Sequence, residues 1–475
     1  MRTRKNRNSW KLARFFVVIA LLAAMAVSMT QIAFAAGSPP DGAEITDTFS
    51  DWAAWDILVA ESVYGLGDEG TYSNYRGSFT DTKFMAVYET LNNRFNASGA
   101  PDIANKSAVT RGEIVTALYG LIAEVLELDK NQSAVDYFAA NGLINGRAYG
   151  DYKLEQTCLT QEMIVFALRV YEHLVYELDE DSAGLFWKIT CDGFPNTVYL
   201  LGTVHLGTNS IYPLSKTIMD AFDSSAYLAV EANIYTISDE DAAYMADKQL
   251  LTDGSTISDY ISEETYEIYK AVAESFGLPP EMYDYYKPWA AYLGIMQTLA
   301  SSGGEGEGAD TMLGIDMYLL TKAFYFDKDV VEVESIKYQV DMFESFSPEL
   351  QDMLLLSVIA PSDDEGESEF SQEEIAEMVR EYIGYMIEAI RNGDEATLTD
   401  MLLASRNYSN PLMREYNTKL WDRRDEGMAE TLVRFLGMKD AEGDFFVAVG
   451  AGHTVGESGI ASVLTKMGYT VERLK

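Results

Sequence analysis

Cysteine is scarce in this sequence, with only Cys158 and Cys191 in 475 residues. Two cysteines are too few for a disulfide framework, and they exclude a cysteine-based zinc site. Basic residues are also few: 35 Lys and Arg stand against 75 Asp and Glu, giving a formal net charge of -40. Such a chain repels polyanions and attracts cations and basic peptides, so nucleic-acid binding through a basic face is excluded.

Long apolar runs are absent, with one exception near the N-terminus. Basic residues precede an apolar run of 13 residues, Phe15 to Val27, and Ala33-Phe34-Ala35 follows it. This order predicts a secretory signal peptide over residues 1–35. The alternative is an uncleaved anchor, but the run is short of the roughly 20 residues that a membrane span needs. We therefore expect a secreted protein, associated with the cell surface or cell wall, with no transmembrane segment after signal removal.

Residues 45–178 have the pattern of a helical module. The sequence predicts helices over about 110–126 and 160–176. Each begins with a threonine, Thr110 or Thr160, that can cap the helix, and an early glutamate favours the positive helix end.

The same residues resemble S-layer homology repeats. Phe49-Ser50-Asp51 matches the opening of a unit, Gly142–Gly146 matches its Gly-Leu-Ile-x-Gly signature, and Thr110-Arg111-Gly112-Glu113 matches its Thr-Arg-x-Glu motif. In a later copy, Gln161 stands where the arginine is expected. The resemblance implies that this all-α module binds an anionic cell-wall polymer through the arginine-bearing motif. The alternative is a helical module with another role.

Residues 184–475 alternate between strand-like and helical patterns. A hairpin is predicted at 185–201, where Asp192-Gly193 separates two β-rich runs. Further strands are predicted at 227–231, 330–334, 445–449 and 469–474. This alternation predicts an α/β or α+β domain with a large helical insertion.

Histidine is rare as well, and two of the three histidines share one local setting. His205 and His453 are each the last residue of a Gly-x-x-His motif, and each motif directly follows an apolar predicted strand. Both are therefore expected just beyond the carboxyl end of a strand, where open α/β sheets bind ligands. The third, His173, lies on a predicted helix of the N-terminal module and is given no role.

Two glutamates occupy comparable places at the ends of strands. Glu231 ends the run 227–231 and Glu334 ends the run 330–334. Neutral imidazole and carboxylate together bind divalent metal ions, so these acids and the two histidines are candidate ligands. The alternative for each glutamate is a solvated strand end.

These residues carry a second resemblance, to the TraB/GumN family, which includes PrgY-type pheromone shut-off proteins and the Tiki metalloproteases. The resemblance covers Gly184–Lys475, in the family's order and spacing. The matching segments are Phe186-Trp187-Lys188-Ile189, Val198–His205, Tyr212-Pro213-Leu214, Val230-Glu231, Gly314-Ile315-Asp316, Val333-Glu334-Ser335 with Gln339, Arg424-Asp425 with Met428, and Val449–His453 with Gly456, Gly459-Ile460 and Gly468-Tyr469.

The resemblance implies an α/β core shared with erythromycin esterase-like and haem-binding ChaN-like proteins. It also implies a metal-dependent hydrolase, a peptidase of the Tiki type acting on peptide or protein substrates. His205, His453, Glu231 and Glu334 would hold a divalent ion such as Mn, Co or Zn, and one of the carboxylates would be the general base. Arg424 would stabilise the oxyanion or hold a carboxylate, and its alternative is a surface salt bridge.

Two other functions are compatible with the same residues. One is a non-catalytic protein that binds a peptide signal, as the PrgY-type members do, with the histidines as recognition groups. The other is capture of haem or a metal ion. Metal content and peptide turnover distinguish these functions.

Overall fold

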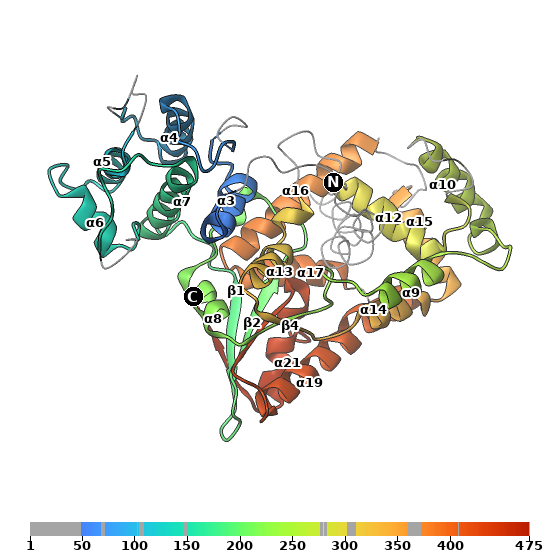
Figure 1. Cartoon of the computed structure of the whole chain (residues 1–475). Helices are drawn as coiled ribbons and strands as arrows, with labels where there is room; N and C mark the ends of the chain where they lie inside the picture. The colour runs from blue at the N-terminus through green and yellow to red at the C-terminus, as the bar shows by residue number, and fades with distance from the viewer. Residues whose placement is uncertain are drawn as a thin grey trace, which may run out of the picture. The chain divides into compact units, whose positions relative to one another are not determined.

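The computed structural model describes residues 49–67, 72–101, 103, 109–145, 150–275, 279, 283–301, 310–359, 372–406 and 408–474. The predicted signal peptide lies outside these residues. The described chain forms two compact units that divide between Asp181 and Ser182, called the N-terminal and C-terminal units below (Figure 1). Cys158 and Cys191 are both free thiols.

The N-terminal unit is built from helices. They are η1 (Asp51–Ala53), α3 (Ala54–Leu58), η2 (Val59–Val63), α4 (Asp81–Phe95), α5 (Arg111–Val125), α6 (Ala134–Ala140) and α7 (Thr160–Glu177). Thr110 caps α5 as predicted, because its side chain accepts from the Glu113 N–H while Glu113 bonds back to Thr110. The predicted cap at Thr160 is wrong: Leu159 is the N-cap, and the Thr160 hydroxyl instead donates to the Gly77 carbonyl at 3.4 Å.

Arg111, the arginine of the Thr-Arg-x-Glu motif, lies inside the N-terminal unit. It is 5% exposed, and its Nη1 lies 2.5 Å from Glu162 Oε1 on α7. Its Nε donates to the Tyr152 carbonyl at 2.9 Å. Arg111 therefore joins α5 to α7, and its guanidinium is engaged within the fold.

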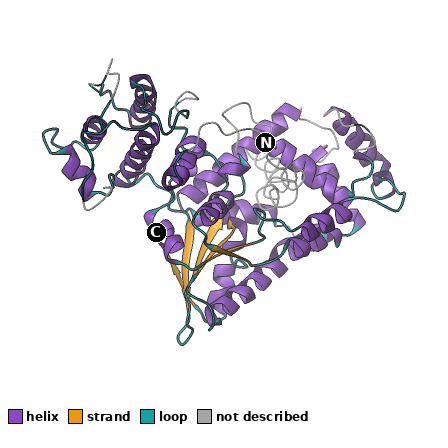
Figure 2. Ribbon diagram, in the orientation of Figure 1, coloured by secondary structure: helices purple, strands orange, loops and turns teal. Residues whose placement is uncertain are grey.

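The C-terminal unit contains a six-stranded sheet in the order β4-β3-β5-β2-β1-β6, drawn in orange in Figure 2. The strands are β1 (Leu185–Thr190), β2 (Val198–Thr203), β3 (Tyr227–Val230), β4 (Asp329–Glu332), β5 (Phe445–Gly450) and β6 (Thr470–Arg473). The predicted hairpin is confirmed, since β1 and β2 pair antiparallel. The prediction of a mixed α/β unit is likewise confirmed.

Four neighbouring strands of this sheet, β4, β3, β5 and β2, run parallel. Their carboxyl ends therefore meet at one edge. In the register, Thr203 of β2 pairs with Gly450 of β5, so the two Gly-x-x-His segments begin side by side. The central strand β5 is buried along its whole length, as its apolar sequence predicts.

Helices pack around the sheet and form the long insertions between strands (Figures 1 and 2). They are η3 (Asn209–Ile211), α8 (Lys216–Ser224), α9 (Asp239–Gln249), η4 (Ile257–Asp259), α10 (Glu263–Ser275), α12 (Pro288–Ser301), η5 (Thr311–Leu313), α13 (Ile315–Tyr325), α14 (Ile336–Glu344), α15 (Pro348–Ile359), α16 (Gln372–Arg391), α17 (Glu395–Ser405), α18 (Pro411–Asn417), η6 (Thr418–Asp422), α19 (Arg423–Gly437), α20 (Ala451–Thr454) and α21 (Ile460–Lys466). Within the described ranges, none of the helices combines the length and apolarity that crossing a membrane requires.

Candidate functional site

The structure brings the four candidate ligands to one edge of the sheet. Glu231 directly follows β3 and Glu334 lies just beyond β4. The backbone pairing continues past these strands, because the Glu334 N–H donates to the Glu231 carbonyl at 2.9 Å. His205 lies in the bend after β2, and His453 lies on α20, directly after β5.

Three of these side chains surround the place where residue 450 would carry a Cβ if it were not glycine; this place is called the Gly450 position below. A Cβ built on Gly450 would lie 3.8 Å from His205 Nε2 and 3.7 Å from His453 Cδ2. It would lie 3.2 Å from Glu231 Oε1. The two imidazoles and one carboxylate therefore border the same position, which a glycine keeps open.

His205 contacts a buried aspartate on α13. Its Nδ1 lies 2.8 Å from Asp316 Oδ2, an ion-pair contact without the alignment of a hydrogen bond. The other oxygen, Oδ1, accepts from the Thr203 hydroxyl at 2.6 Å. Burial lowers the pKa of His205, but Asp316 and Glu231 outweigh this effect and raise the pKa to about 9. In the protein without a bound cation, His205 is therefore an imidazolium near neutral pH.

His453 has the opposite electrostatic environment, although it too contacts an aspartate. Its ring is fully buried, and its Nδ1 lies 2.5 Å from Asp425 Oδ1. Burial, and then the positive charges of Arg424 and Arg406, lower the pKa of His453 well below its usual range. The ring is therefore neutral near pH 7, and among the residues that the structure describes its Nε2 has no hydrogen-bond partner.

Arg424 joins the two glutamates. Its Nη2 donates to Glu231 Oε2 at 2.7 Å and to Glu334 Oε2 at 2.8 Å, and its Nε lies 3.0 and 3.1 Å from the two Glu334 oxygens. The guanidinium is 2% exposed, which excludes the surface salt bridge considered above. Gln339 donates weakly to both carboxylates, and the Gly450 N–H donates to Glu231 Oε1 at 2.7 Å.

These contacts leave the two glutamates with different surroundings. Both oxygens of Glu334 accept hydrogen bonds from Arg424. Glu231 instead accepts from Arg424 through Oε2 and from the Gly450 N–H through Oε1. Burial raises the pKa of Glu334, although the charge of Arg424 opposes this shift. Glu231 is thus the carboxylate that faces the histidines.

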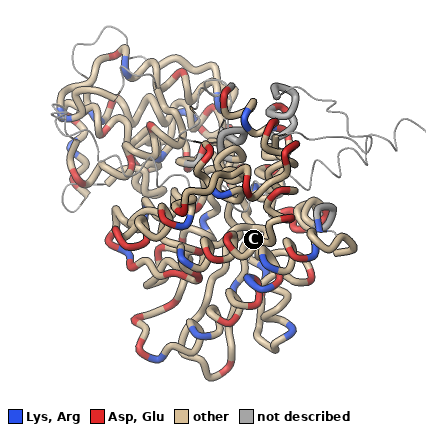
Figure 3. The backbone as a smooth tube through the Cα atoms, turned by 90° about the vertical axis from the view of Figure 1, so that its right-hand side faces the viewer, with Lys and Arg blue, Asp and Glu red and all other residues tan. Residues whose placement is uncertain are grey.

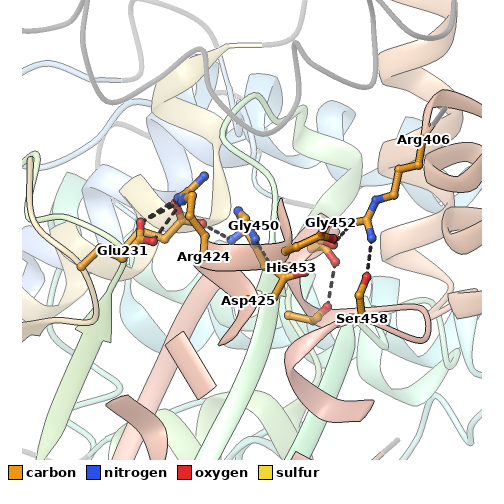
Figure 4. A network of polar contacts seen from close by, with 12 residues as sticks. Glu231, Arg406, Arg424, Asp425, Gly450, Gly452, His453 and Ser458 are labelled. Carbon is orange, nitrogen blue, oxygen red and sulfur yellow. Dashed lines mark hydrogen bonds and ion pairs between the residues drawn. The ribbon is translucent and has the colours of Figure 1, made fainter. Parts of the chain in front are cut away.

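One long helical segment supplies the residues around His453. Helices α18 and α19 are continuous through the π-helical turn η6, and such turns are frequent at functional sites. Trp421 of η6 packs its ring 4.8 Å from the His453 ring, and Arg424 and Asp425 follow on α19. Figure 4 shows Arg424 between Glu231 and the histidine region, with Asp425 at His453.

Arg406 adds a second positive charge near His453. Its guanidinium lies 4.9 Å from the Trp421 ring centroid, and its Nη1 donates to the Ser458 hydroxyl at 2.6 Å (Figure 4). Its Nη2 lies 3.5 Å from the Gly452 carbonyl, next to His453. No sequence motif indicated a role for this residue.

A divalent ion needs at least three donor side chains around one position. Across the described ranges, no three His, Cys, Asp or Glu side chains form a ready metal-binding group. The physical reason is Arg424, which occupies Glu334 and one oxygen of Glu231. His205 Nε2 and Glu231 Oε1 are nevertheless donors of the preferred kind near the Gly450 position, where the nearest His453 atom is Cδ2. The buried Nε2 of His453 has no hydrogen-bond partner among the described residues.

Asp316 and Asp425 are two further site residues to which the sequence assigned no role. Both stood within recognised motifs, Gly314-Ile315-Asp316 and Arg424-Asp425. Asp316 lies between Ile315 and Met317 on a helix, whereas Asp425 follows two arginines. The placement of Asp316 was the available signal, because a buried acid needs a partner. His173, in contrast, bonds the Tyr137 hydroxyl at 2.8 Å in the N-terminal unit, away from these residues in the chain.

Comparison with known proteins decides the family. Residues 185–473 match the TraB/PrgY/gumN family. The chain belongs to this family. As a TraB/PrgY/gumN family protein it is similar to an uncharacterized protein of Treponema pallidum (strain Nichols), 23% identical over 289 residues, which covers 59% of this chain and 80% of that protein. The family match begins at residue 185 and does not extend into the N-terminal unit, so the S-layer resemblance gains no support from it.

Two further relatives of this TraB/PrgY/gumN protein carry the name uncharacterized protein YbaP. They come from Escherichia coli (strain K12) and Shigella flexneri, and each is 26% identical over 144 residues. The alignment covers 30% of this chain and half the length of each YbaP protein. No solved structure matches the chain, so the core shared with erythromycin esterase-like and ChaN-like proteins stays a prediction.

Proposed function

We propose that this family member is a metal-dependent hydrolase that cleaves peptides. One observation carries the proposal: His205, His453 and Glu231 border the position that Gly450 leaves open. Each imidazole has its Nδ1 at a carboxylate, which is the usual arrangement of metal-binding histidines.

His205, His453 and Glu231 would hold a divalent ion such as Mn, Co or Zn. An ion bound there would lower the pKa of a bound water molecule and polarise a carbonyl oxygen. Glu334 lies beside Glu231 and would not hold the ion, so it would be the carboxylate that accepts a proton from the attacking water. Arg424 orients both carboxylates and contributes positive charge beside the reacting carbonyl.

The charge of the chain favours a basic peptide as substrate. Acidic side chains outnumber basic ones, as the red and blue segments of Figure 3 illustrate. A field of this sign concentrates cationic peptides near the surface. Steering of this kind weakens with added salt, so KM for a basic peptide should rise with ionic strength while KM for a neutral peptide stays constant.

Export to the cell surface is a separate proposal, carried by the signal-peptide pattern. N-terminal sequencing of the secreted protein should begin at Ala36. Wall binding by the N-terminal unit is tested by retention of the purified protein on cell-wall sacculi, and the burial of Arg111 means that residues other than this arginine must make the contact.

The hydrolase proposal is tested on purified mature protein. Bound metal is measured, and cleavage of a peptide library is followed with and without a chelator. His205→Ala and His453→Ala are expected to lose metal and cleavage together, whereas His173→Ala keeps both. Cleavage that survives complete metal removal would overturn the metal role, and tight peptide binding without cleavage would identify a binding protein instead.

A further inference from the structure

Arg406 directly follows α17 and lies beside the segment that carries His453. Its guanidinium lies 4.9 Å from the Trp421 ring centroid, and the same ring packs 4.8 Å from the His453 ring. Its Nη2 lies 3.5 Å from the carbonyl oxygen of Gly452, the residue before His453. In Figure 4, Arg406 and Glu231 lie on either side of His453. This positive charge is therefore next to the candidate site.

The guanidinium of Arg406 has no Asp or Glu partner among the described residues. A guanidinium carries five N–H donors. Two hydrogen bonds use them, to Ser458 Oγ at 2.6 Å and weakly to the Gly452 carbonyl, and Nε is buried without a partner in the described part of the chain. Arg424, in contrast, is paired with two glutamates. Because charges that leave water are ordinarily paired, an arginine with spare donors beside a candidate site indicates an anionic ligand.

Ser458 supplies a second donor at the same place. Its Oγ accepts from Arg406, so its own O–H points elsewhere, and within the described ranges that hydrogen meets no acceptor. Arg406 and Ser458 are both partly exposed, so a ligand can reach them. Stacking on Trp421 holds the guanidinium plane in place. A planar fork of this kind suits a carboxylate, which it binds through two parallel hydrogen bonds.

The net charge of the chain narrows the choice of carboxylate. A formal charge of -40 disfavours peptides that are rich in Asp and Glu. The anion that even a basic peptide carries is the α-carboxylate of its last residue. This group lies within about 4 Å of the carbonyl carbon of the last peptide bond, so a subsite next to the candidate site can hold it during cleavage of that bond.

We infer that Arg406 and Ser458 form a carboxylate subsite that binds the C-terminus of the peptide, so that the protein is a carboxypeptidase. The inference deepens the proposed function and rests on it. Hydrolysis adds one water across the last peptide bond: the water oxygen bonds to the carbonyl carbon, the C–N bond breaks, and the freed amine takes up a proton. The products are a peptide one residue shorter and a free amino acid.

Two basic peptides of one sequence test the subsite, one with a free C-terminal carboxylate and one with a C-terminal amide. Wild type should cleave the free-acid peptide with a kcat/KM about 10- to 100-fold higher, as expected for charge-assisted hydrogen bonds. Mass spectrometry should show loss of the last residue. Equal rates for the two peptides, or cleavage confined to internal bonds, would overturn the inference and leave the proposed hydrolase intact.

Substitution of Arg406 should remove the preference without removing the metal. Arg406→Met should lower kcat/KM for the free-acid peptide by about 10- to 100-fold and leave that for the amide unchanged. Arg406→Lys should keep part of the preference, because an ammonium retains the charge but not the planar fork. Arg423→Met, at an exposed position, is the control and should keep the wild-type ratio. Equal losses on both peptides in Arg406→Met would assign Arg406 a structural role and overturn the inference.

Peptide binding separates this inference from the proposed function. A wild-type protein that cleaves neither peptide would sink the hydrolase proposal, and calorimetric titration of the two peptides then decides the subsite. The free-acid peptide should bind about 10- to 100-fold more tightly than the amide, and Arg406→Met should abolish the difference. Equal affinities in wild type would overturn the carboxylate subsite.

Discussion

Arg424 donates to Glu231 across 193 residues of sequence, with an Nη2 to Oε2 distance of 2.7 Å. The same guanidinium is bound by Glu334, and all three charged side chains are almost fully buried. Buried charges are tolerated when they are paired and hydrogen-bonded, and each of these is. The positive charge of Arg424 thus allows two carboxylates to lie beside each other at the sheet edge.

Removing this charge should destabilise the C-terminal unit strongly. Arg424→Met leaves two buried carboxylates without their cation, which typically costs about 3–5 kcal/mol. Arg424→Lys should recover only part of this, since an ammonium lacks the planar fork that contacts both acids. Urea unfolding measures the loss. Arg423→Met, at the exposed neighbouring position, should stay within about 0.5 kcal/mol of wild type; equal effects at 423 and 424 would contradict the prediction.

A methyl group at residue 450 should block the shared position without unfolding the protein. Gly450 has φ of -49°, which alanine adopts readily, but the new Cβ would lie 3.2 Å from Glu231 Oε1 and between the two imidazoles. Gly450→Ala should therefore lose metal binding and peptide cleavage by more than about tenfold while its melting temperature changes little.

The matched control for that substitution is Gly427→Ala on α19. No atom of the described residues lies within 4 Å of a Cβ at this residue, and alanine in a helix is favoured over glycine by up to about 1 kcal/mol. This variant should be slightly more stable and fully active. If Gly450→Ala behaved in the same way, the two histidines and Glu231 would not share a functional position.

The His205–Asp316 pair should make the stability of metal-free protein depend on pH. The pKa of His205 is raised from 6.5 to about 9 in the folded state. The folded protein therefore binds the proton more tightly, so this contribution is fully present below pH 6.5 and is lost as pH rises through 9. A shift of this size corresponds to at most about 3 kcal/mol.

The contribution of His205 to the free energy of unfolding is isolated by comparing wild type with His205→Gln, because the other titrating groups are common to both proteins. The difference in their unfolding free energies should shrink between pH 6 and pH 9.5. A constant difference would show that Asp316 does not hold a proton on His205. Metal binding must displace this proton, so affinity for zinc should increase as pH rises toward 9.

Tyr292 on α12 and Tyr416 on α18 allow the cost of a buried, unpaired hydroxyl to be measured. Each is about 1% exposed, and neither hydroxyl has a hydrogen-bond partner within the described part of the chain. Tyr292→Phe and Tyr416→Phe should each stabilise the protein by up to about 1–3 kcal/mol, because the desolvated hydroxyl is removed. Tyr269→Phe is the control: its hydroxyl donates to the Tyr283 carbonyl at 3.1 Å, so that variant should lose about 1 kcal/mol. Destabilisation of all three would contradict the assignment.

The sheet edge could be predicted from sequence because its signal is local. An apolar run followed by Gly-x-x-His places a histidine at a strand end, and parallel pairing of β2 with β5 brings the two ends together. The same reasoning places Glu231 and Glu334 beside them. Local pattern therefore sufficed to place these four residues at one edge of the sheet.

The partners of those residues could not be selected in this way. Asp316 and Asp425 are two acids among 75, and they come from helices whose packing depends on tertiary contacts. The different surroundings of Glu231 and Glu334 depend on which of their oxygens bind Arg424. Differences of this size in position cannot be predicted from the sequence. The Thr160 cap failed for a similar reason, because the hydroxyl found a distant carbonyl at Gly77.

The π-helical turn η6 has a consequence for any attempt to shorten or redesign this helix. A π-helical turn is closed by an i→i+5 hydrogen bond and so holds one residue more than an α-helical turn. Deleting one residue from Thr418–Asp422 should therefore give a regular helix that leaves Arg424 and Asp425 near their present places at the sheet edge. Inserting one further residue there should instead rotate both side chains by about 100° away from that edge.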